Sequence, residues 1–273
     1  MDAGTATTIP VTPRAQRVLR RDNVIAALVH LVQAVAVLVL ATDFALPVTA
    51  AYLEGPPGTA PQDPVTLFDI RTGVAVAAFL GLSAVAHAVV ATVWWPRYLA
   101  DLGRGRNPAR WVEYSISSSL MIVLIAQLVG IADVAALIAL FGVNTSMILF
   151  GWLQERYESP GSGGWLPFFF GCIAGIVPWA AITVYLLSPG SSSSATPPGF
   201  VYGIFVSLFV FFNIFALNQW LQYRRLGRWR DYIFGERVYI LLSLTAKSAL
   251  AWQGLRRHPR ELAHGAPRPC ADP

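Results

Sequence analysis

Lys247 is the only lysine of the chain, and all the other cationic side chains among its 20 Lys and Arg residues are arginines. It lies within LLSLTAKSALAWQ, residues 241–253, an apolar helical stretch in which a charge is costly. Arginine stays protonated, whereas a desolvated lysine can release its proton and form an imine with a carbonyl compound. We therefore expect Lys247 to hold an aldehyde ligand covalently.

Glu113 is the best candidate for the counter-ion of Lys247, because we place no other carboxylate in the interior of a predicted span. Lys247 lies ten residues after Arg237 and nine before Arg256, which at about 1.5 Å per residue places it near the middle of the membrane. Glu113 lies five residues after Pro108, and a tilt of its helix would bring the two groups to one depth. The alternative is a plain structural ion pair that joins two helices.

The composition is that of an integral membrane protein. The chain has 273 residues, of which 55% are apolar and 13% charged, whereas a soluble domain carries about 25% charged residues. The net charge of +5 collects at the ends of the apolar runs, so we interpret it as a topology signal and expect no nucleic-acid partner. The expected partner is the lipid bilayer.

Seven apolar stretches reach the length of about 20 residues that crosses a bilayer, so the sequence predicts an all-α polytopic fold with seven transmembrane helices. The expected spans are residues 23–44, 70–95, 108–131, 134–154 and 231–255, with two more inside the uncharged segment 159–223, on either side of the Pro-, Gly- and Ser-rich stretch 188–199. The connection 45–68 is longer than a link between helices requires, so we expect it to form ordered structure at the membrane surface.

The distribution of arginines predicts the orientation of the chain. With the N-terminus in the cytoplasm, fourteen arginines fall in cytoplasmic segments and five in extracellular ones. We therefore place the N-terminus in the cytoplasm and the C-terminus outside. The expected parts are a polar cytoplasmic leader (residues 1–21), a membrane domain (22–256) that includes the extracellular connection 45–68, and an extracellular tail (257–273).

Few other titratable side chains lie in the predicted spans. They are His30 and His87, with Asp43 and Asp133 close to the outer ends. An ionisable group inside a membrane is a functional hypothesis by default, although a single histidine more often has a structural role. No motif supplies a nucleophile–base pair in a cleft or a cluster of metal ligands, so neither an enzyme nor a metal site is expected.

Four segments resemble the heliorhodopsins, a family of seven-helix retinal proteins whose N-terminus faces the cytoplasm. They are RWVEYSISSSLMIVLIAQLVGIAD (110–133), NTSMILFGWLQE (144–155), FNIFALNQWLQYRR (212–225) and SLTAKSALAW (243–252). The resemblance extends over all seven spans, residues 20–256. It implies a light-sensing photoreceptor of the cell membrane in which all-trans retinal is bound to Lys247 as a protonated Schiff base, with Glu113 as counter-ion. It also implies a homodimer, and an unidentified partner protein would receive the signal.

The resemblance also implies the surroundings of the retinal. It places His30 and His87 in a polar cluster on the cytoplasmic side of Lys247, and Gln33, Ser117 and Ser243 lie one helical turn from residues of this site. The positions that match the family's retinal pocket, for which plain helix packing is nearly as good an explanation, are Met121, Asn144, Met147, Gly151, Pro178, Trp179, Phe212 and Asn213. Gly151 would make room for the ligand, and Pro178 could bend its helix around it.

The residue types disfavour ion pumping. Pumping rhodopsins generally carry a second carboxylate one turn before the lysine, where this chain has Ser243, and many have a carboxylic donor at the position occupied here by Leu124. We therefore expect signalling without net transport, with the proton retained near Glu113 and the histidines. The alternatives are a light-gated proton channel or pump, and a retinal-free transporter or scaffold in which Lys247 and Glu113 form a plain ion pair.

Overall fold

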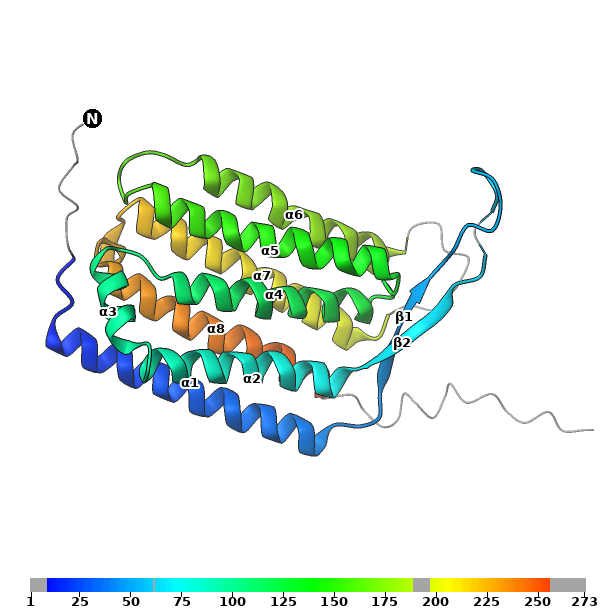
Figure 1. Ribbon diagram of the computed structural model, residues 1–273, viewed down its shortest axis with the longest axis horizontal. Coiled ribbons are helices and arrows are strands. Elements are labelled where there is room, and N and C mark those ends of the chain that lie inside the picture. Colours follow the sequence, from blue (N-terminus) through cyan, green and yellow to red (C-terminus); the bar gives the residue numbers. More distant parts are fainter. Residues whose placement is uncertain (1–8, 61, 189–196, 256–273) are drawn as a thin grey trace, which may run out of the picture.

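Eight α-helices, one 3₁₀-helix and two β-strands form the part of the chain that the computed structural model describes, residues 9–60, 62–188 and 197–255. In chain order they are α1 (Pro13–Leu40), β1 (Ala45–Ala50), β2 (Val65–Arg71), α2 (Thr72–Ala91), α3 (Trp95–Gly103), α4 (Pro108–Leu128), α5 (Val134–Tyr157), α6 (Leu166–Leu187), α7 (Gly199–Tyr223), η1 (Gly227–Arg230) and α8 (Tyr232–Leu255). The long helices lie side by side along one axis, and the strands project beyond one end (Figure 1). We call this the hairpin end and the opposite end, where α3 lies, the α3 end.

Capping residues decide where the helices that carry the candidate site begin. The side chain of Asn107 accepts a hydrogen bond from the backbone N–H of Arg110, and Pro108 occupies the first turn of α4. The Asp133 carboxylate accepts hydrogen bonds of 3.0 Å from the first backbone N–H groups of α5. Because α4 begins at Pro108, Glu113 lies between one and two turns from the α3 end of the bundle.

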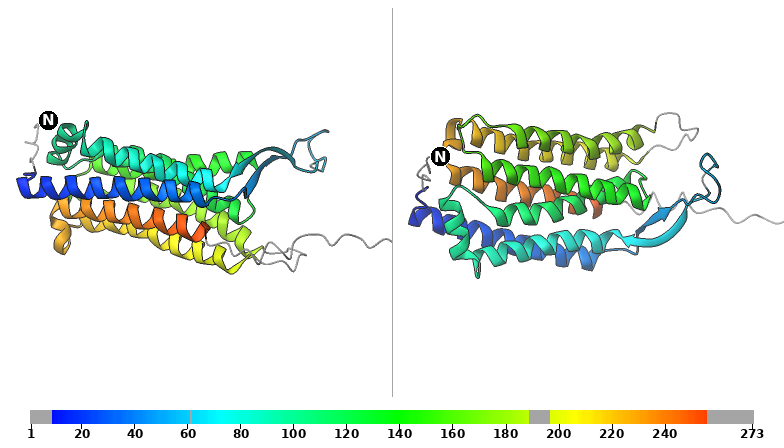
Figure 2. Two further views of the ribbon diagram at one scale, coloured as in Figure 1. Left: turned by 90° about the horizontal axis from the view of Figure 1, so that it is seen from below. Right: turned by 45° about the horizontal axis from the view of Figure 1, so that its top comes forward.

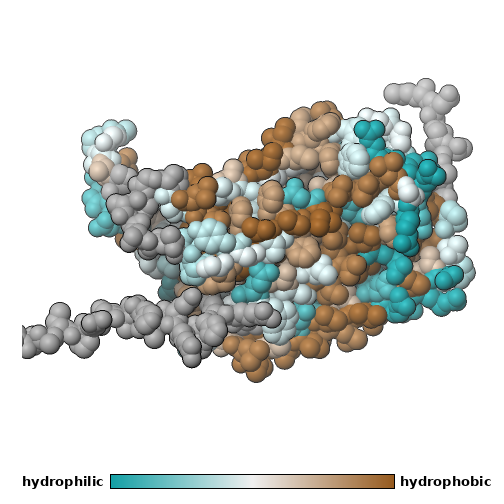
Figure 3. Space-filling model, turned by 180° about the vertical axis from the view of Figure 1, so that it is seen from behind, coloured by the Kyte–Doolittle hydropathy of each residue, from teal (hydrophilic) through white to brown (hydrophobic). Residues whose placement is uncertain are grey.

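Seven of the described helices form the membrane-crossing bundle. Six of them, α1, α2, α4, α5, α6 and α7, are long and apolar enough to cross a membrane. The seventh, α8, has 24 residues and lies against α1 and α7, although it carries Glu236, Arg237 and Lys247. Apolar side chains cover the middle of the molecule, and hydrophilic side chains gather at the α3 end (Figure 3). The chain is therefore an all-α multi-pass membrane protein.

The predicted ordered structure in the connection 45–68 is an antiparallel hairpin of β1 and β2, with Ala45 opposite Arg71 and Ala50 opposite Val65. The backbone N–H of Thr49 donates a 2.8 Å hydrogen bond to the carbonyl of Ala132, in the link between α4 and α5. This contact holds β1 against the bundle. Both views in Figure 2 show the hairpin extending beyond the helix ends.

The structure differs from the sequence prediction at the α3 end. The helix α1 begins at Pro13, inside the segment expected to be a polar leader, because Leu19 is fully buried in an apolar cluster with Tyr98 and Leu102 of α3. The span predicted to run to residue 95 ends at Ala91, and α3 follows as a separate short helix. The predicted tail, residues 257–273, lies outside the described residues, as do residues 1–8.

The interior has two halves of different chemistry. Toward the hairpin end it is an apolar cluster to which most of the spanning helices contribute, with Val37, Leu80, Ile122, Ile125 and Leu250 among its buried members. The buried Arg, Lys, Glu and His side chains of the described residues lie elsewhere, at the depth of Lys247 and between it and the α3 end; they are His30, Arg110, Glu113, Glu155, Glu236 and Lys247. This asymmetry positions the candidate site.

Candidate functional site

Lys247 forms a buried ion pair with Glu113, as their residue types and depths predict. The Nζ atom of Lys247 on α8 donates a 2.6 Å hydrogen bond to Oε1 of Glu113 on α4. Both side chains are almost fully buried, with exposed fractions of 4% and 6%. Such a charge-assisted bond offsets part of the cost of removing both groups from water. A primary amine and its carboxylate partner therefore lie together near the middle of the bundle.

Ser83 on α2 completes this pair, and the sequence analysis missed it. Its hydroxyl donates a 2.6 Å hydrogen bond to Oε1 of Glu113 and accepts a 2.7 Å hydrogen bond from Nζ of Lys247. Its spacing from His87 could have predicted this position, because Ser83 precedes His87 by four residues and therefore lies on the same face of the helix.

His30 and His87 lie against each other beside this pair. Their rings stack with centroids 5.8 Å apart, which brings α1 and α2 together. Nδ1 of His87 is 2.8 Å from Oδ1 of the buried Asn23. Within the described part of the chain, Nε2 of His87 and both ring nitrogens of His30 are buried without a hydrogen-bond partner. Each neutral imidazole can therefore bind one further proton, at the ring nitrogen that carries none.

The other predicted members of the polar cluster take different positions. Ser117 and Ser243 are buried on α4 and α8, one turn from Glu113 and from Lys247. Gln33 faces α8, where the hydroxyl of Ser248 accepts a 2.8 Å hydrogen bond from Nε2 of Gln33. Gln33 therefore joins α1 to α8 next to Lys247 and does not contact the ion pair.

Glu113 was expected to be the only carboxylate in the interior of a span. That prediction was wrong. Glu155 and Glu236 are also buried, with exposed fractions of 5% and 1%. Both pair with the buried Arg110, whose Nη2 is 2.8 Å from Oε1 of Glu155 and whose Nη1 contacts Oε1 of Glu236. The fourth span was expected to end at residue 154, but α5 continues to Tyr157. The guanidinium allows Glu236 to face the interior, since a paired carboxylate can be buried. We call these three residues the Arg110 cluster.

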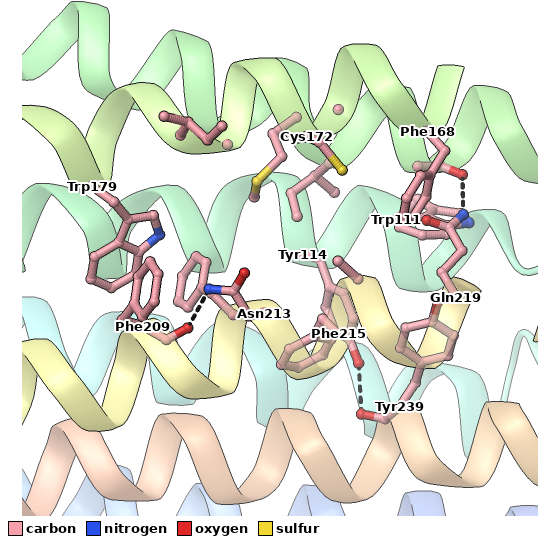
Figure 4. Close-up of a pocket in the computed structure, with 18 residues that line it drawn as sticks. Trp111, Tyr114, Phe168, Cys172, Trp179, Phe209, Asn213, Phe215, Gln219 and Tyr239 are labelled. Carbon is pink, nitrogen blue, oxygen red and sulfur yellow. Dashed lines mark hydrogen bonds between the residues drawn. The ribbon is translucent and has the colours of Figure 1, made fainter. Parts of the chain in front are cut away.

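A cavity of about 290 Å³ opens among α4, α5, α6, α7 and α8 (Figure 4). Aromatic rings form much of its wall, including Trp111, Tyr114, Phe168, Phe209 and Phe215. Five of the predicted pocket residues line it, namely Met147, Gly151, Trp179, Phe212 and Asn213. The other three do not: Met121 and Pro178 are buried in helix packing, and Asn144 donates hydrogen bonds to Ser118 and Ser119.

Two glycines shape this cavity by admitting neighbouring side chains. A Cβ atom on Gly151 would lie 2.6 Å from the ring of Trp111, and one on Gly175 would lie 2.7 Å from Sδ of Met147. Gly151 was expected to make room for a ligand. The space beside it is occupied by Trp111, so its small size lets α4 and α5 approach closely.

The residues present fit the retinal that the sequence resemblance implies. Tyr114 connects the two parts of the site, because it lines the cavity and its ring centroid is 5.3 Å from Nζ of Lys247. Lys247 offers the amine that a retinal aldehyde requires, Glu113 a counter-ion, and the aromatic cavity an apolar surface, with a volume near the lower end of ordinary ligand pockets. Among the described residues, no group of three metal-binding side chains is present.

Solved structures with the same fold are microbial rhodopsins and related proteins. The transmembrane domain and linker region of the Salpingoeca rosetta rhodopsin phosphodiesterase matches with a TM-score of 0.64 and 13% identity, covering 93% of this chain and 86% of that one. A light-driven proton pump from Leptosphaeria maculans matches with a TM-score of 0.58 and 14% identity, covering 90% and 97% of the two chains. Cyanorhodopsin from the cyanobacterium Tolypothrix matches with a TM-score of 0.56 and 15% identity, covering 93% and 99%.

At these identities the likeness shows the fold alone. No curated protein matches the sequence. The sequence profile of the heliorhodopsin family matches residues 19–256, which include the other spanning helices in full, α1 except for its first six residues, and the ion pair of Lys247 and Glu113.

Proposed function

Because this chain belongs to the heliorhodopsin family, we propose that it is a light-sensing protein of the cell membrane that holds all-trans retinal covalently on Lys247. The observation that carries the proposal is the buried contact of 2.6 Å between the single lysine and Glu113, next to an aromatic cavity. If the ion pair were only structural, arginine would suit the position better than lysine, because a guanidinium pairs with a carboxylate through two hydrogen bonds.

The protein's own groups hold and balance the chromophore. Bound retinal supplies absorption of visible light and isomerisation about a double bond. Lys247 provides the attachment atom Nζ, and Glu113 balances the positive charge at this atom. Ser83 contacts both groups and therefore keeps the carboxylate at the same side of Nζ. The stacked His30 and His87 offer nitrogens that can hold a proton within the same region.

We propose that light changes the conformation of the helices and that a partner protein detects this change without net ion transport. The buried charged groups at Lys247 and beyond it toward the α3 end support this, since the interior toward the hairpin end is apolar. In our proposal the α3 end, where the arginines concentrate, faces the cytoplasm, the hairpin end faces outside, and two copies form a homodimer.

The test is the absorption spectrum of membranes that contain the protein and added all-trans retinal. We expect a visible band in the wild type and none in Lys247→Arg, because the guanidinium can keep the ion pair but cannot form an imine. Glu113→Gln serves as the second variant. It retains Lys247, so its band should persist at a shifted wavelength, because the charge that balances Nζ is removed.

The absence of a visible band from correctly inserted wild-type protein would overturn the proposal. Lys247 and Glu113 would then be a plain ion pair, and the retinal-free transporter or scaffold would be the better explanation. A band that persists in Lys247→Arg would exclude Lys247 as the attachment site.

A further inference from the structure

The Arg110 cluster holds one more negative than positive charge if both of its carboxylates are ionised. Arg110 contributes one guanidinium, and Glu155 and Glu236 contribute two carboxylates, all with exposed fractions below one tenth. An uncompensated charge is expensive in the interior of a membrane protein, so the cluster would gain from binding one proton. The cluster connects α4, α5 and α8, and the proposed function gives it no role.

The two carboxylates of the cluster have different numbers of hydrogen-bond donors. Glu155 accepts hydrogen bonds from the side chains of Trp111 at 2.6 Å, Arg110 at 2.8 Å and Tyr232 at 2.9 Å, and from the backbone N–H of Asn107 at 2.8 Å. Glu236 accepts only from the side chains of Asn107, at 2.7 Å, and Arg110 among the described residues. Donors stabilise the ionised form of a carboxylate, so Glu236 is the member that can accept a proton more readily.

Glu236 also faces the region of the ion pair, whereas Glu155 does not. A cavity of about 40 Å³ is lined by Glu236, Arg110 and Asn107 on one side and by Glu113 and His87 on the other. Glu155 does not line it. A cavity of this size has room for about one water molecule between polar groups. Glu113 and Glu236 therefore share a polar space within the same half of the bundle.

We propose that Glu236 is the residue that finally receives the proton released from Nζ of Lys247 when the protein is illuminated. This inference rests on the proposed function. The N–H bond at Nζ breaks, Glu113 takes the proton first, and the proton then passes through the shared cavity to a carboxylate oxygen of Glu236. Lys247 loses one positive charge and Glu236 one negative charge, so the total charge of the interior does not change, and the proton returns when Nζ is protonated again.

Among the groups around the shared cavity, Glu236 is the best proton acceptor. Arg110 stays protonated, and its guanidinium carbon lies 3.9 Å from the ring centroid of Tyr239. Glu155 is saturated with donors, one of which is the hydroxyl of Tyr232. From α1 and α2, Asn23 and His87 face the cavity and are bonded to each other through Nδ1 of His87. Nε2 of His87 has no hydrogen-bond partner among the described residues, but a proton there would add a buried cation, whereas a proton on Glu236 removes the surplus negative charge of the cluster. Tyr98 of α3 also faces the cavity, and its buried phenol is a poor proton acceptor.

Protonation of Glu236 would also change how α8 is held. The ion pair of Arg110 and Glu236 joins α4 to the first turns of α8, and Glu155 would then be the only charged partner of Arg110. The attraction between α4 and α8 would decrease at the α3 end. Movement of the proton thus converts an event at Lys247 into looser packing at the end of the bundle that carries the arginines.

The first test is a light-minus-dark infrared spectrum of the retinal-loaded protein. We expect the C=O stretching band of a protonated carboxylic acid to appear with the visible change that marks deprotonation of Nζ. It should disappear in Glu236→Gln and remain in the control variant Glu158→Gln, which removes a carboxylate at the end of α5 that lies outside the cluster. Glu236→Asp keeps a carboxyl group at this position, so its band should shift in frequency and not disappear. Such a shift would identify residue 236 even if Glu236→Gln misfolds.

The second test needs no retinal and uses Glu236→Gln as a mimic of the protonated carboxyl group. Amide hydrogen exchange of the first turns of α8 in the retinal-free protein should become about tenfold faster than in the wild type, the size expected when a charge-assisted contact is lost. Exchange in α6, which contributes no residue to the cluster, serves as the internal reference.

The outcomes separate the two proposals. A visible band with a light-induced change but no carboxyl band that depends on Glu236 would overturn this inference and leave the proposed function intact. Unchanged exchange in α8 would overturn the coupling to helix packing. Absence of any visible band from the wild type would overturn both proposals.

Discussion

At the scale of single residues, the charge of Lys247 is tolerated because three polar groups from three helices meet. Glu113 supplies the opposite charge and Ser83 bonds to both members of the pair. A buried ion pair recovers its desolvation cost only when its remaining donors and acceptors are satisfied. The serine is therefore part of what keeps this pair inside the bundle.

Ser83→Ala should destabilise the retinal-free protein by about 1–3 kcal/mol, because the change leaves Nζ of Lys247 and Oε1 of Glu113 each with one buried hydrogen bond fewer. The measurement is the free energy of unfolding in detergent micelles. Ser146→Ala is the matched control, since this exposed serine on α5 bonds only to the backbone carbonyl of Gly142. Equal effects of both substitutions would show that Ser83 does not support the pair.

At the scale of elements, the approach of α4 to α5 depends on one glycine. The ring of Trp111 lies where a side chain at position 151 would begin, and its Nε1 donates a 2.6 Å hydrogen bond to Glu155. The small residue thus lets one tryptophan line the cavity and reach the Arg110 cluster at once. Packing of this kind, with small residues where helices approach closely, is common between membrane helices.

Gly151→Ala should destabilise the protein by about 1–3 kcal/mol, because overpacking displaces the ring of Trp111. Gly142→Ala on the same helix is the matched control. Nothing lies within 4 Å of a Cβ atom built there, so alanine should be neutral or stabilise the helix by up to about 1 kcal/mol. Unfolding of both variants in detergent measures the difference, and a neutral Gly151→Ala would contradict the packing argument.

Most of the spanning helices could be predicted from the sequence, because an uncharged apolar stretch of about 20 residues is typical of a helix that crosses a membrane. The expected spans at 108–131 and 231–255 correspond to α4 (Pro108–Leu128) and α8 (Tyr232–Leu255). The start of α1 and the separate helix α3 were not predicted. Leu19 belongs to a region with four nearby arginines, and only its contacts with α3 make it part of a helix that is buried on one side.

At the scale of the whole molecule, the charged half of the interior is held together by Arg110. Its guanidinium contacts carboxylates from α5 and α8, while Asn107 at the start of its own helix bonds to both of them. Helices far apart in the sequence are thus joined at the α3 end.

Arg110→Ala should cost about 3–5 kcal/mol of the free energy of unfolding, since it leaves two buried carboxylates without their cation. Arg237→Ala is the control for loss of an arginine from a pair between α8 and α1. Its partner is Asp22 at 2.7 Å, and the arginine side chain is 43% exposed, so we expect a loss below about 1 kcal/mol. Similar losses in the two variants would contradict the structural role of the Arg110 cluster.

The asymmetry of the interior also predicts the absence of net transport. Since the apolar half offers no buried charged side chain among the described residues, a proton released at Lys247 should return by the path it took. Illuminated cells that express the protein should show no steady photocurrent and no lasting pH change in the medium. A sustained light-dependent current would instead support the proton channel or pump.

The sequence by itself determined the membrane class, the approximate spans and the pairing of Lys247 with Glu113. These follow from hydrophobicity, from helix length and from the rarity of ionisable groups in apolar runs, which are local properties. Only the tertiary structure decided that Ser83 completes the pair, that the ring of Trp111 lies against Gly151, and that Glu155 and Glu236 are buried. A carboxylate near a helix end can face water or a guanidinium on another helix, and the choice depends on which helices are neighbours.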